Sequence, residues 1–203
     1  MENGRARVAV FISGGGTGLQ AFIDAVKAGI LNAEIAFVVS NRRDAYGLER
    51  AAKTGIDSFV FKLKKYDSPD DAGKDLLEKL REHGIDYIAL AGYLKLLPVD
   101  VVRAFSGRIV NIHPALLPKY GGKGMYGHFV HEAVLASGDK ESGCTVHLVD
   151  EIYDHGKVLE QAKVPVEPGD TPDTLAARVQ AEEHRLYPRV LEKLIRGEYS
   201  LNG

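Results

Sequence analysis

The sequence predicts an α/β protein with an open, mostly parallel sheet, helices on both faces, and an antiparallel strand pair on the C-terminal side. Three observations indicate this class. Short apolar runs alternate with stretches of helical spacing, and within these runs apolar residues do not alternate with polar ones. The last two strand-like runs follow each other with no helix between them. Continuous apolar runs are typical of strands that are covered on both faces.

Four strand-and-helix units fill the first half of the chain. The expected strands cover residues 8–12, 35–39, 58–61 and 87–90. The helices that follow them are expected over residues 19–26, 46–52, 72–80 and 99–105. Parallel strands joined by right-handed helical crossovers are the natural arrangement for such units. A fifth apolar run, over 108–112, resembles a further strand but ends in His113-Pro114 rather than in a helix cap.

The second half has a different pattern. Residues 113–127 are too rich in glycine and proline for a regular element, which is typical of a functional or disordered loop. A helix is expected from about His128 to Ala136. Strands over 145–149 and 158–166, joined by a short turn around 154–156, predict an antiparallel pair. A last long helix begins near Thr171-Pro172-Asp173, a cap with proline in the first turn, and runs towards Ile195.

Composition narrows the possible partners. The 203 residues hold 26 Lys and Arg against 28 Asp and Glu, a formal net charge of −2, which disfavours a diffuse nucleic-acid surface. The single cysteine, Cys144, excludes an internal disulfide and indicates a reducing compartment. No signal peptide or membrane-spanning run is evident. We therefore expect one cytoplasmic domain over 1–203 that acts on small molecules, without nucleic-acid or membrane partners, as a monomer or weak homodimer.

A glycine-rich loop, Ser13-Gly-Gly-Gly-Thr-Gly18, lies where the first strand ends and the first helix begins. Amides at a helix N-terminus bind anions, and successive glycines let a phosphate approach the backbone. A dinucleotide fold would show Gly-x-Gly-x-x-Gly and an acidic residue closing the second strand, which here ends in Ser40-Asn41-Arg42-Arg43. The loop favours a small phosphomonoester, with a tight turn that binds nothing as the alternative.

Asn111 and His113 lie two residues apart, so on a strand they project to the same face at the carboxyl edge of the sheet. An asparagine amide can donate to a developing oxyanion, and a histidine can move a proton near neutral pH. Asp154 is the expected third partner, because a nearby carboxylate raises the pKa of an imidazole. The alternative for Asp154 is a purely structural role in a turn. The three side chains suit attack of an amine on a carbonyl.

The remaining histidines do not predict a metal site. His128 and His131, three apart on an expected helix, are expected at the surface or as loop anchors. His147, in the middle of a strand, is expected to be a hydrogen-bonded core histidine. Cys144, at the start of that strand, is expected to be a small buried residue.

Together these segments resemble the glycinamide ribonucleotide formyltransferases, a family of folate-dependent enzymes. The resemblance runs in order along nearly the whole chain. It is carried by residues 10–20, 40–51, 90–95, 111–118, 145–154, 161–166 and 177–184. The Asn-x-His-Pro-x-Leu-Leu-Pro element over 111–118 is typical of folate formyltransferases in general. The glycine loop and the Arg-Val-Gln…Glu-His element favour this family within them.

The resemblance implies transfer of the formyl group of 10-formyltetrahydrofolate, a co-substrate, to the amine of 5-phosphoribosylglycinamide in purine synthesis, without a metal. Asn111, His113 and Asp154 match the catalytic residues. The positions that match ribonucleotide-binding residues are Gly15, Gly16, Thr17, Gly18, Leu19, Gln20, Gln180 and Glu183. The positions that match the folate pocket are Leu94, Lys95, Leu96, Leu97, Asn111, Asp150, Glu151, Ile152, Tyr153 and Asp154. The resemblance also implies a nucleotide-binding half over about 1–110 and a folate-binding, catalytic half over about 111–203.

Two alternatives stay open. A deformylase would use water in place of the amine but usually carries an extra N-terminal domain, and a nucleotide-binding module without catalysis would leave Asn111, His113 and Asp154 unexplained. The chain departs from the family pattern at Gly18, Pro69 and His155. His155 adds a second titratable ring beside Asp154.

Overall fold

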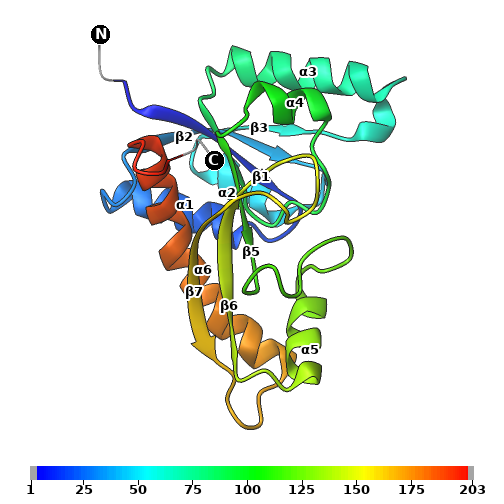
Figure 1. Ribbon diagram of the computed structural model, residues 1–203. Coiled ribbons are helices and arrows are strands. Elements are labelled where there is room, and N and C mark those ends of the chain that lie inside the picture. Colours follow the sequence, from blue (N-terminus) through cyan, green and yellow to red (C-terminus); the bar gives the residue numbers. More distant parts are fainter. Residues whose placement is uncertain (1–3, 201–203) are drawn as a thin grey trace.

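The computed structural model describes residues 4–200 and contains one mixed seven-stranded sheet with helices packed around it (Figure 1). The strands are β1 Ala6–Ile12, β2 Ala33–Ser40, β3 Asp57–Val60, β4 Tyr87–Leu90, β5 Ile109–His113, β6 Glu141–Leu148 and β7 Val158–Pro165. Their order is β3-β2-β1-β4-β5-β6-β7. The first five strands are parallel, and β6 and β7 are antiparallel to their neighbours. The predicted fold class is confirmed.

Each predicted helix is present, with ends that differ by a few residues from the prediction. The helices are α1 Thr17–Lys27, α2 Tyr46–Lys53, α3 Pro69–Glu82, α4 Val99–Ala104, α5 His128–Ser137 and α6 Pro172–Ile195, and a 3₁₀ turn covers Leu63–Lys65. Within residues 4–200, no helix combines the length and the apolar character that a membrane crossing requires.

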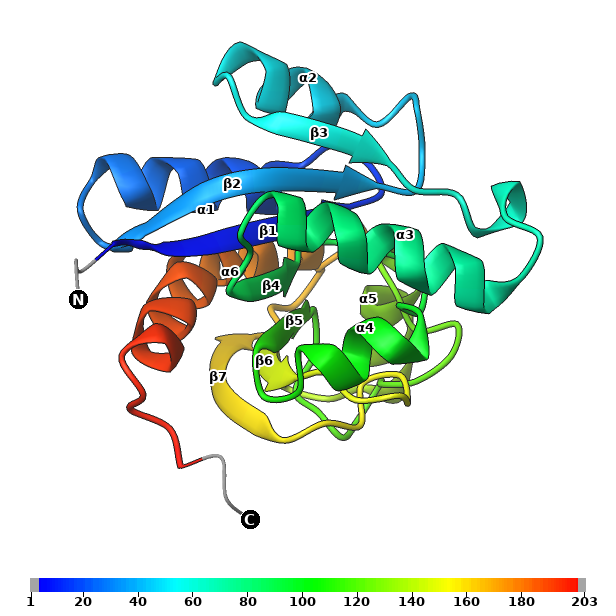
Figure 2. The same ribbon diagram turned by 90° about the horizontal axis from the view of Figure 1, so that it is seen from above.

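The sheet is covered on both faces, which explains the continuous apolar runs. In β1, Val8, Val10 and Ile12 pack on the side of α1 and α6, while Ala9 and Phe11 pack on the side of α3 and α4. Figure 2 shows α3 and α4 on one face of the sheet and α1 and α6 on the other. Because both faces are buried, the polar groups that can meet a ligand gather at the ends of the strands.

Helix α6 links the two halves of the sheet to the glycine loop. The Thr171 hydroxyl accepts from the Thr174 N–H in a capping box, and proline occupies the first turn, as predicted. Further along, the Tyr187 hydroxyl lies 2.8 Å from the Val110 carbonyl and 3.1 Å from the Leu90 carbonyl. This buried contact fixes α6 against β4 and β5, and therefore fixes the side chains one and two turns earlier on the helix.

Two details of the antiparallel pair differ from the prediction. Strand β6 begins at Glu141, so Cys144 lies inside the strand and is buried. The connection to β7 is the nine-residue segment 149–157 rather than a short turn around 154–156. The start of β6 is polar, so no apolar run in the sequence indicates it. Residues 141–144 form a strand because they pair with residues 162–165 of β7.

Candidate active site

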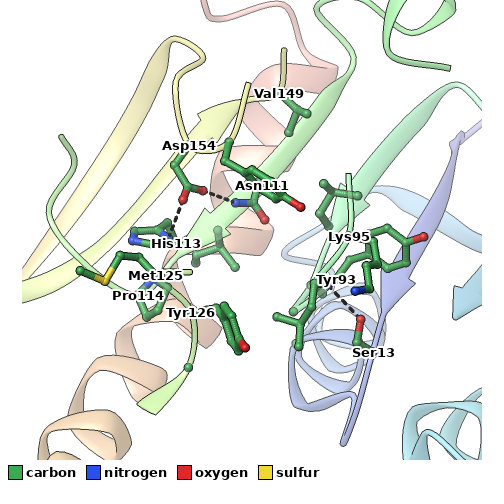
Figure 3. Close-up of a pocket in the computed structure, with 18 of the residues that line it drawn as sticks. Ser13, Tyr93, Lys95, Asn111, His113, Pro114, Met125, Tyr126, Val149 and Asp154 are labelled. Carbon is green, nitrogen blue, oxygen red and sulfur yellow. Dashed lines mark hydrogen bonds and ion pairs between the residues drawn. The ribbon is translucent and has the colours of Figure 1, made fainter. Parts of the chain in front are cut away.

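A cavity of about 960 Å³ opens at the carboxyl ends of the parallel strands. Its lining includes Ser13 after β1, Asn41 after β2, Leu94 after β4, and Asn111 in β5. After β1 the chain builds the sheet outward to β3 and then returns to place β4 on the other side of β1. Open α/β sheets bind ligands at such a switch point. Figure 3 shows the residues around this cavity.

The structure brings Asn111, His113 and Asp154 together from separate elements. Asp154 Oδ2 lies 3.5 Å from His113 Nδ1, and Asp154 Oδ1 lies 3.5 Å from Asn111 Nδ2. Figure 3 shows the Asp154 carboxylate directed at both partners. The Gly122 N–H donates to Asp154 Oδ2 at 2.9 Å, and Asp154 itself has φ of 53°, a left-handed conformation that is uncommon for aspartate. The loop over 149–157 therefore holds this carboxylate over the end of β5.

His113 is buried, with 3% of its surface exposed. Its Nε2 lies 2.7 Å from the Tyr120 carbonyl, which can only accept, so Nε2 carries a proton and Nδ1 is the atom that titrates. Burial lowers the pKa of His113, and although Asp154 and the Tyr120 carbonyl raise it, burial prevails. Asp154 therefore raises the pKa of His113 as expected, but in the free protein burial of the ring outweighs this effect.

Asp154 keeps its charge in the same surroundings. Burial acts to raise the pKa of Asp154, but the neighbouring imidazoles of His147 and His113 and the Gly122 N–H together lower it. A neutral imidazole therefore faces an ionised carboxylate, which is ready to stabilise a proton that arrives at His113 Nδ1.

His147 belongs to this group, although sequence reasoning assigned it to the core. It is 2% exposed, and its Nδ1 donates to the Leu148 carbonyl at 2.8 Å. Nε2 of the neutral ring can then only accept, and it lies 3.0 Å from Asn111 Nδ2. Asn111 and His147 are directly paired in the ladder of β5 and β6. No local pattern in the sequence identifies this partnership, because it depends on the register between β5 and β6.

The glycine loop lies at the other end of the cavity. Helix α1 begins at Thr17, and its first internal hydrogen bond runs from the Gln20 N–H to the Gly16 carbonyl. The amides of Thr17, Gly18 and Leu19 therefore precede the helical hydrogen bonds, and amides in this position are the donors that anions bind in proteins. Thr17 and Gly18 line the cavity.

Other predicted ribonucleotide-binding residues have different surroundings. The Leu19 side chain is fully buried in the core, so only its backbone can meet a ligand. Gln20 bonds to Asp24 and Arg50 on the far side of α1. Gly16, with φ of 70°, packs against α2, and Gly15 presents its carbonyl to Arg50.

Gln180 and Glu183 extend the cavity lining along α6. The Gln180 amide donates to the Thr17 hydroxyl at 3.3 Å, which connects α6 to the glycine loop. Burial raises the pKa of Glu183 to about 7. This carboxyl group therefore changes charge near neutral pH. A bound ligand with a hydroxyl or an amine can then favour the protonated or the ionised carboxyl group.

The predicted folate-pocket residues form two facing walls. Leu94, Lys95, Leu96 and Leu97 follow β4, and residues 150–154 lie across the cavity from the glycine loop. The Leu94 N–H donates to the Ser13 hydroxyl at 2.9 Å, so the first wall is attached to the glycine loop. Leu94 and Leu96 are about half exposed, which leaves apolar surface for a flat ring system.

Further lining residues were not predicted. His131 is 4% exposed and lines the cavity, so its expected surface position is wrong. It lies on a helix, α5, that packs on α6. His128 is half exposed at the start of the same helix. Tyr93, Met125 and Tyr126 also contribute, from loops whose paths no sequence pattern indicates. Among residues 4–200, no group of three or more His, Cys, Asp or Glu side chains is arranged to hold a metal ion.

Comparison with known proteins supports a relationship over most of the chain. Residues 6–191 match the formyl transferase family. Phosphoribosylglycinamide formyltransferase from Haemophilus influenzae is 42% identical over 198 residues, which cover 96% of this chain and 90% of that protein. The chloroplastic phosphoribosylglycinamide formyltransferase from Arabidopsis thaliana is 47% identical over 94% of this chain, which spans 65% of that protein's length.

Solved structures give the same relationship. Glycinamide ribonucleotide transformylase 1 from Symbiobacterium toebii superposes with a TM-score of 0.91 at 40% identity, covering 98% of this chain and 92% of that one. A formyltetrahydrofolate deformylase from Pseudomonas syringae has a TM-score of 0.87 at 22% identity, a likeness of fold alone. The chain therefore belongs to the formyl transferase family, and the relatives that it matches over nearly its whole length include phosphoribosylglycinamide formyltransferases.

Proposed function

We propose that this protein transfers the formyl group of 10-formyltetrahydrofolate to the amine of 5-phosphoribosylglycinamide, giving formylglycinamide ribonucleotide and tetrahydrofolate in purine synthesis. The observation that carries the proposal is the convergence of Asn111, His113 and Asp154 in one cavity that also reaches an anion site at the start of α1. The relationship to phosphoribosylglycinamide formyltransferases over nearly the whole chain supports it.

The two substrates enter from opposite ends of the cavity. The phosphate of the ribonucleotide binds the amides of Thr17 and Gly18, and Gln180 and Glu183 on α6 hold the ribose and glycinamide part. The folate ring lies between the walls formed by residues 94–97 and 150–154. Its formyl carbon is then next to Asn111, between the two binding regions. The first half of the chain thus contributes most of the nucleotide site, and residues 111–203 contribute the catalytic group.

The chemistry follows from the donors around that carbon. The neutral amine attacks the formyl carbon, a C–N bond forms, and a pair of electrons moves onto the oxygen. One Asn111 N–H is bonded to His147, while the other makes only a 3.5 Å contact with Asp154 and remains the donor for the oxyanion. Such a donor typically accounts for about 10²–10³ in rate.

Proton transfer completes the reaction. The attacking amine loses a proton, and the folate nitrogen must gain one as its bond to the formyl carbon breaks. His113 Nδ1 takes up and releases this proton, and the Asp154 carboxylate 3.5 Å away stabilises the charged ring while it exists. No metal is needed for these steps, because the amine is a sufficient nucleophile once it is neutral.

An assay with each substrate omitted in turn tests the proposal. Tetrahydrofolate release, followed by absorbance, should require both 10-formyltetrahydrofolate and 5-phosphoribosylglycinamide, and mass spectrometry should detect the formylated ribonucleotide. Release of formate and tetrahydrofolate without the ribonucleotide would indicate a deformylase instead. Binding of the ribonucleotide with no turnover would indicate a nucleotide-binding module. Sedimentation with and without substrates tests the further proposal of a monomer or weak homodimer.

A further inference from the structure

His155 lies directly after Asp154 but is not part of the cavity lining. The cavity lining includes residues 150–154, while His155 lies outside it, with 67% of its side chain exposed. Its Nδ1 is nevertheless 2.7 Å from Oδ2 of Asp150, five residues earlier. Because a carboxylate only accepts, Nδ1 carries the proton of this bond. The contact joins the two ends of the segment 150–155, which includes Asp154.

The other end of the Asp150 carboxylate shapes the same segment. Asp150 Oδ1 accepts from the Ile152 N–H at 2.8 Å, which folds the backbone at the start of this segment. At its base the loop is closed by the Leu148 N–H bonded to the Lys157 carbonyl at 2.8 Å. Gly156 packs so closely on the Leu148 carbonyl that no side chain fits there. The base is thus fixed by the backbone, whereas the tip depends on side chains.

The tip carries the groups that matter for the proposed reaction. Ile152 and Tyr153 are exposed and form the outer part of the wall across from Leu94–Leu97. Asp154 has a left-handed backbone conformation, which costs free energy unless neighbouring contacts maintain it. The Gly122 N–H holds the Asp154 side chain, and the next residue, His155, is bonded to Asp150.

We propose that His155 is a positioning residue for the folate co-substrate. Through its bond to Asp150, called here the loop clasp, it keeps the segment 150–154 in the shape that forms the folate wall. This inference rests on the proposed function and deepens it. His155 touches neither substrate, so its removal affects folate binding through Asp150, and it leaves the ribonucleotide site at α1 and α6 unchanged.

Three substitutions at one position test the geometry. His155→Ala removes the clasp and should raise the KM for 10-formyltetrahydrofolate roughly two- to fivefold, a modest effect because the pair is exposed. The KM for the ribonucleotide should stay at the wild-type value, and kcat should change little because the Gly122 N–H still holds the Asp154 carboxylate. His155→Asn should restore the wild-type KM, since its amide nitrogen occupies the position of Nδ1. His155→Gln, whose amide nitrogen matches Nε2 instead, should behave like His155→Ala.

Variants that also carry Asp150→Ala test whether Asp150 is the partner of His155. In Asp150→Ala, which has lost the acceptor, adding His155→Ala should raise the KM for the folate no further. An unchanged folate KM in His155→Ala, equal rescue by Asn and Gln, or additive effects in the Asp150→Ala background would each overturn the clasp.

The same variants are also titrated with tetrahydrofolate by calorimetry, without the ribonucleotide. If the wild-type protein fails to transfer a formyl group, the proposed function fails, but weaker tetrahydrofolate binding by His155→Ala and Gln than by wild type and Asn still supports the clasp. Equal binding by all four proteins overturns it.

Discussion

Nε2 of His147 accepts a hydrogen bond from the Asn111 amide, with 3.0 Å between the two nitrogens. Because Nδ1 of His147 is committed to the Leu148 carbonyl, this bond fixes which end of the Asn111 amide faces the strand and which faces the cavity. A core histidine thereby sets the direction of the proposed oxyanion donor.

Asn111→Ala should lower kcat by about 10²–10³, because the oxyanion loses its donor. The KM values should change little, since the amide meets the formyl oxygen most strongly in the transition state. Steady-state kinetics with both substrates check this, and circular dichroism confirms that the variant is folded. A kcat within threefold of wild type would remove Asn111 from the mechanism.

Glu183→Gln should make the protein more stable at pH 8 and leave it unchanged at pH 4.5. Burial raises the pKa of Glu183 to about 7, whereas the unfolded chain titrates near its ordinary value of 4.5. Between these values the folded state binds more protons, so stability falls as pH rises through this window. The loss of stability, complete near pH 8, is on the order of 3 kcal/mol.

Thermal unfolding of Glu183→Gln and wild type at the two pH values measures this difference. The variant should also bind the ribonucleotide more weakly, because the carboxyl group faces the cavity. A difference in Tm that is the same at pH 4.5 and pH 8 would show that the charge of Glu183 is not what costs stability.

Gly47 lies on α2, outside the cavity, and Gly47→Ala should displace the glycine loop by steric contact. A Cβ on Gly47 would lie 2.3 Å from Ile12 Cδ1 and 3.2 Å from the Gly16 Cα. The overpacking should cost about 1–3 kcal/mol of unfolding free energy and raise the KM for the ribonucleotide. Gly14→Ala is the matched control, since a Cβ there meets nothing within 4 Å. Equal stability of the two variants in urea would contradict the close packing of α2 on the loop.

Thr145→Val should destabilise the segment that follows His113. The buried Thr145 hydroxyl donates to the Ala115 carbonyl at 2.6 Å and accepts from the Leu117 N–H and the Gln161 amide. Valine has the same shape but leaves the Ala115 carbonyl and the Leu117 N–H without this partner, at a cost of about 2–4 kcal/mol. Thr145→Ser keeps the hydroxyl and should lose much less. Urea unfolding that shows the reverse order would exclude this role.

Much of the fold follows from local patterns in the sequence. The apolar runs of β1 and β2 and the capped start of α6 at Thr171 are visible because burial on both faces and capping chemistry act on neighbouring residues. The polar start of β6 and the length of the 149–157 loop are not visible in this way. Both depend on pairing with β7, which is a long-range property.

In the candidate site, too, some features follow from local sequence patterns and others depend on long-range contacts. Asn111 and His113 share a strand, so their common face follows from a two-residue spacing. The partnership of Asn111 with His147 depends on the register between β5 and β6, which no local signal indicates. The pKa of His113 depends on burial by the whole fold, which outweighs the effect of Asp154 that the sequence predicted.

In the proposed reaction, His113 moves the proton for formyl transfer at a carbon that Asn111 and Asp154 also face. The most direct measurement is kcat for formyl transfer to 5-phosphoribosylglycinamide by wild type and His113→Ala at saturating substrates. We predict a loss of about 10²–10⁴ in His113→Ala, with tetrahydrofolate and ribonucleotide still bound. A folded His113→Ala that transfers formyl groups at the wild-type rate would contradict the account.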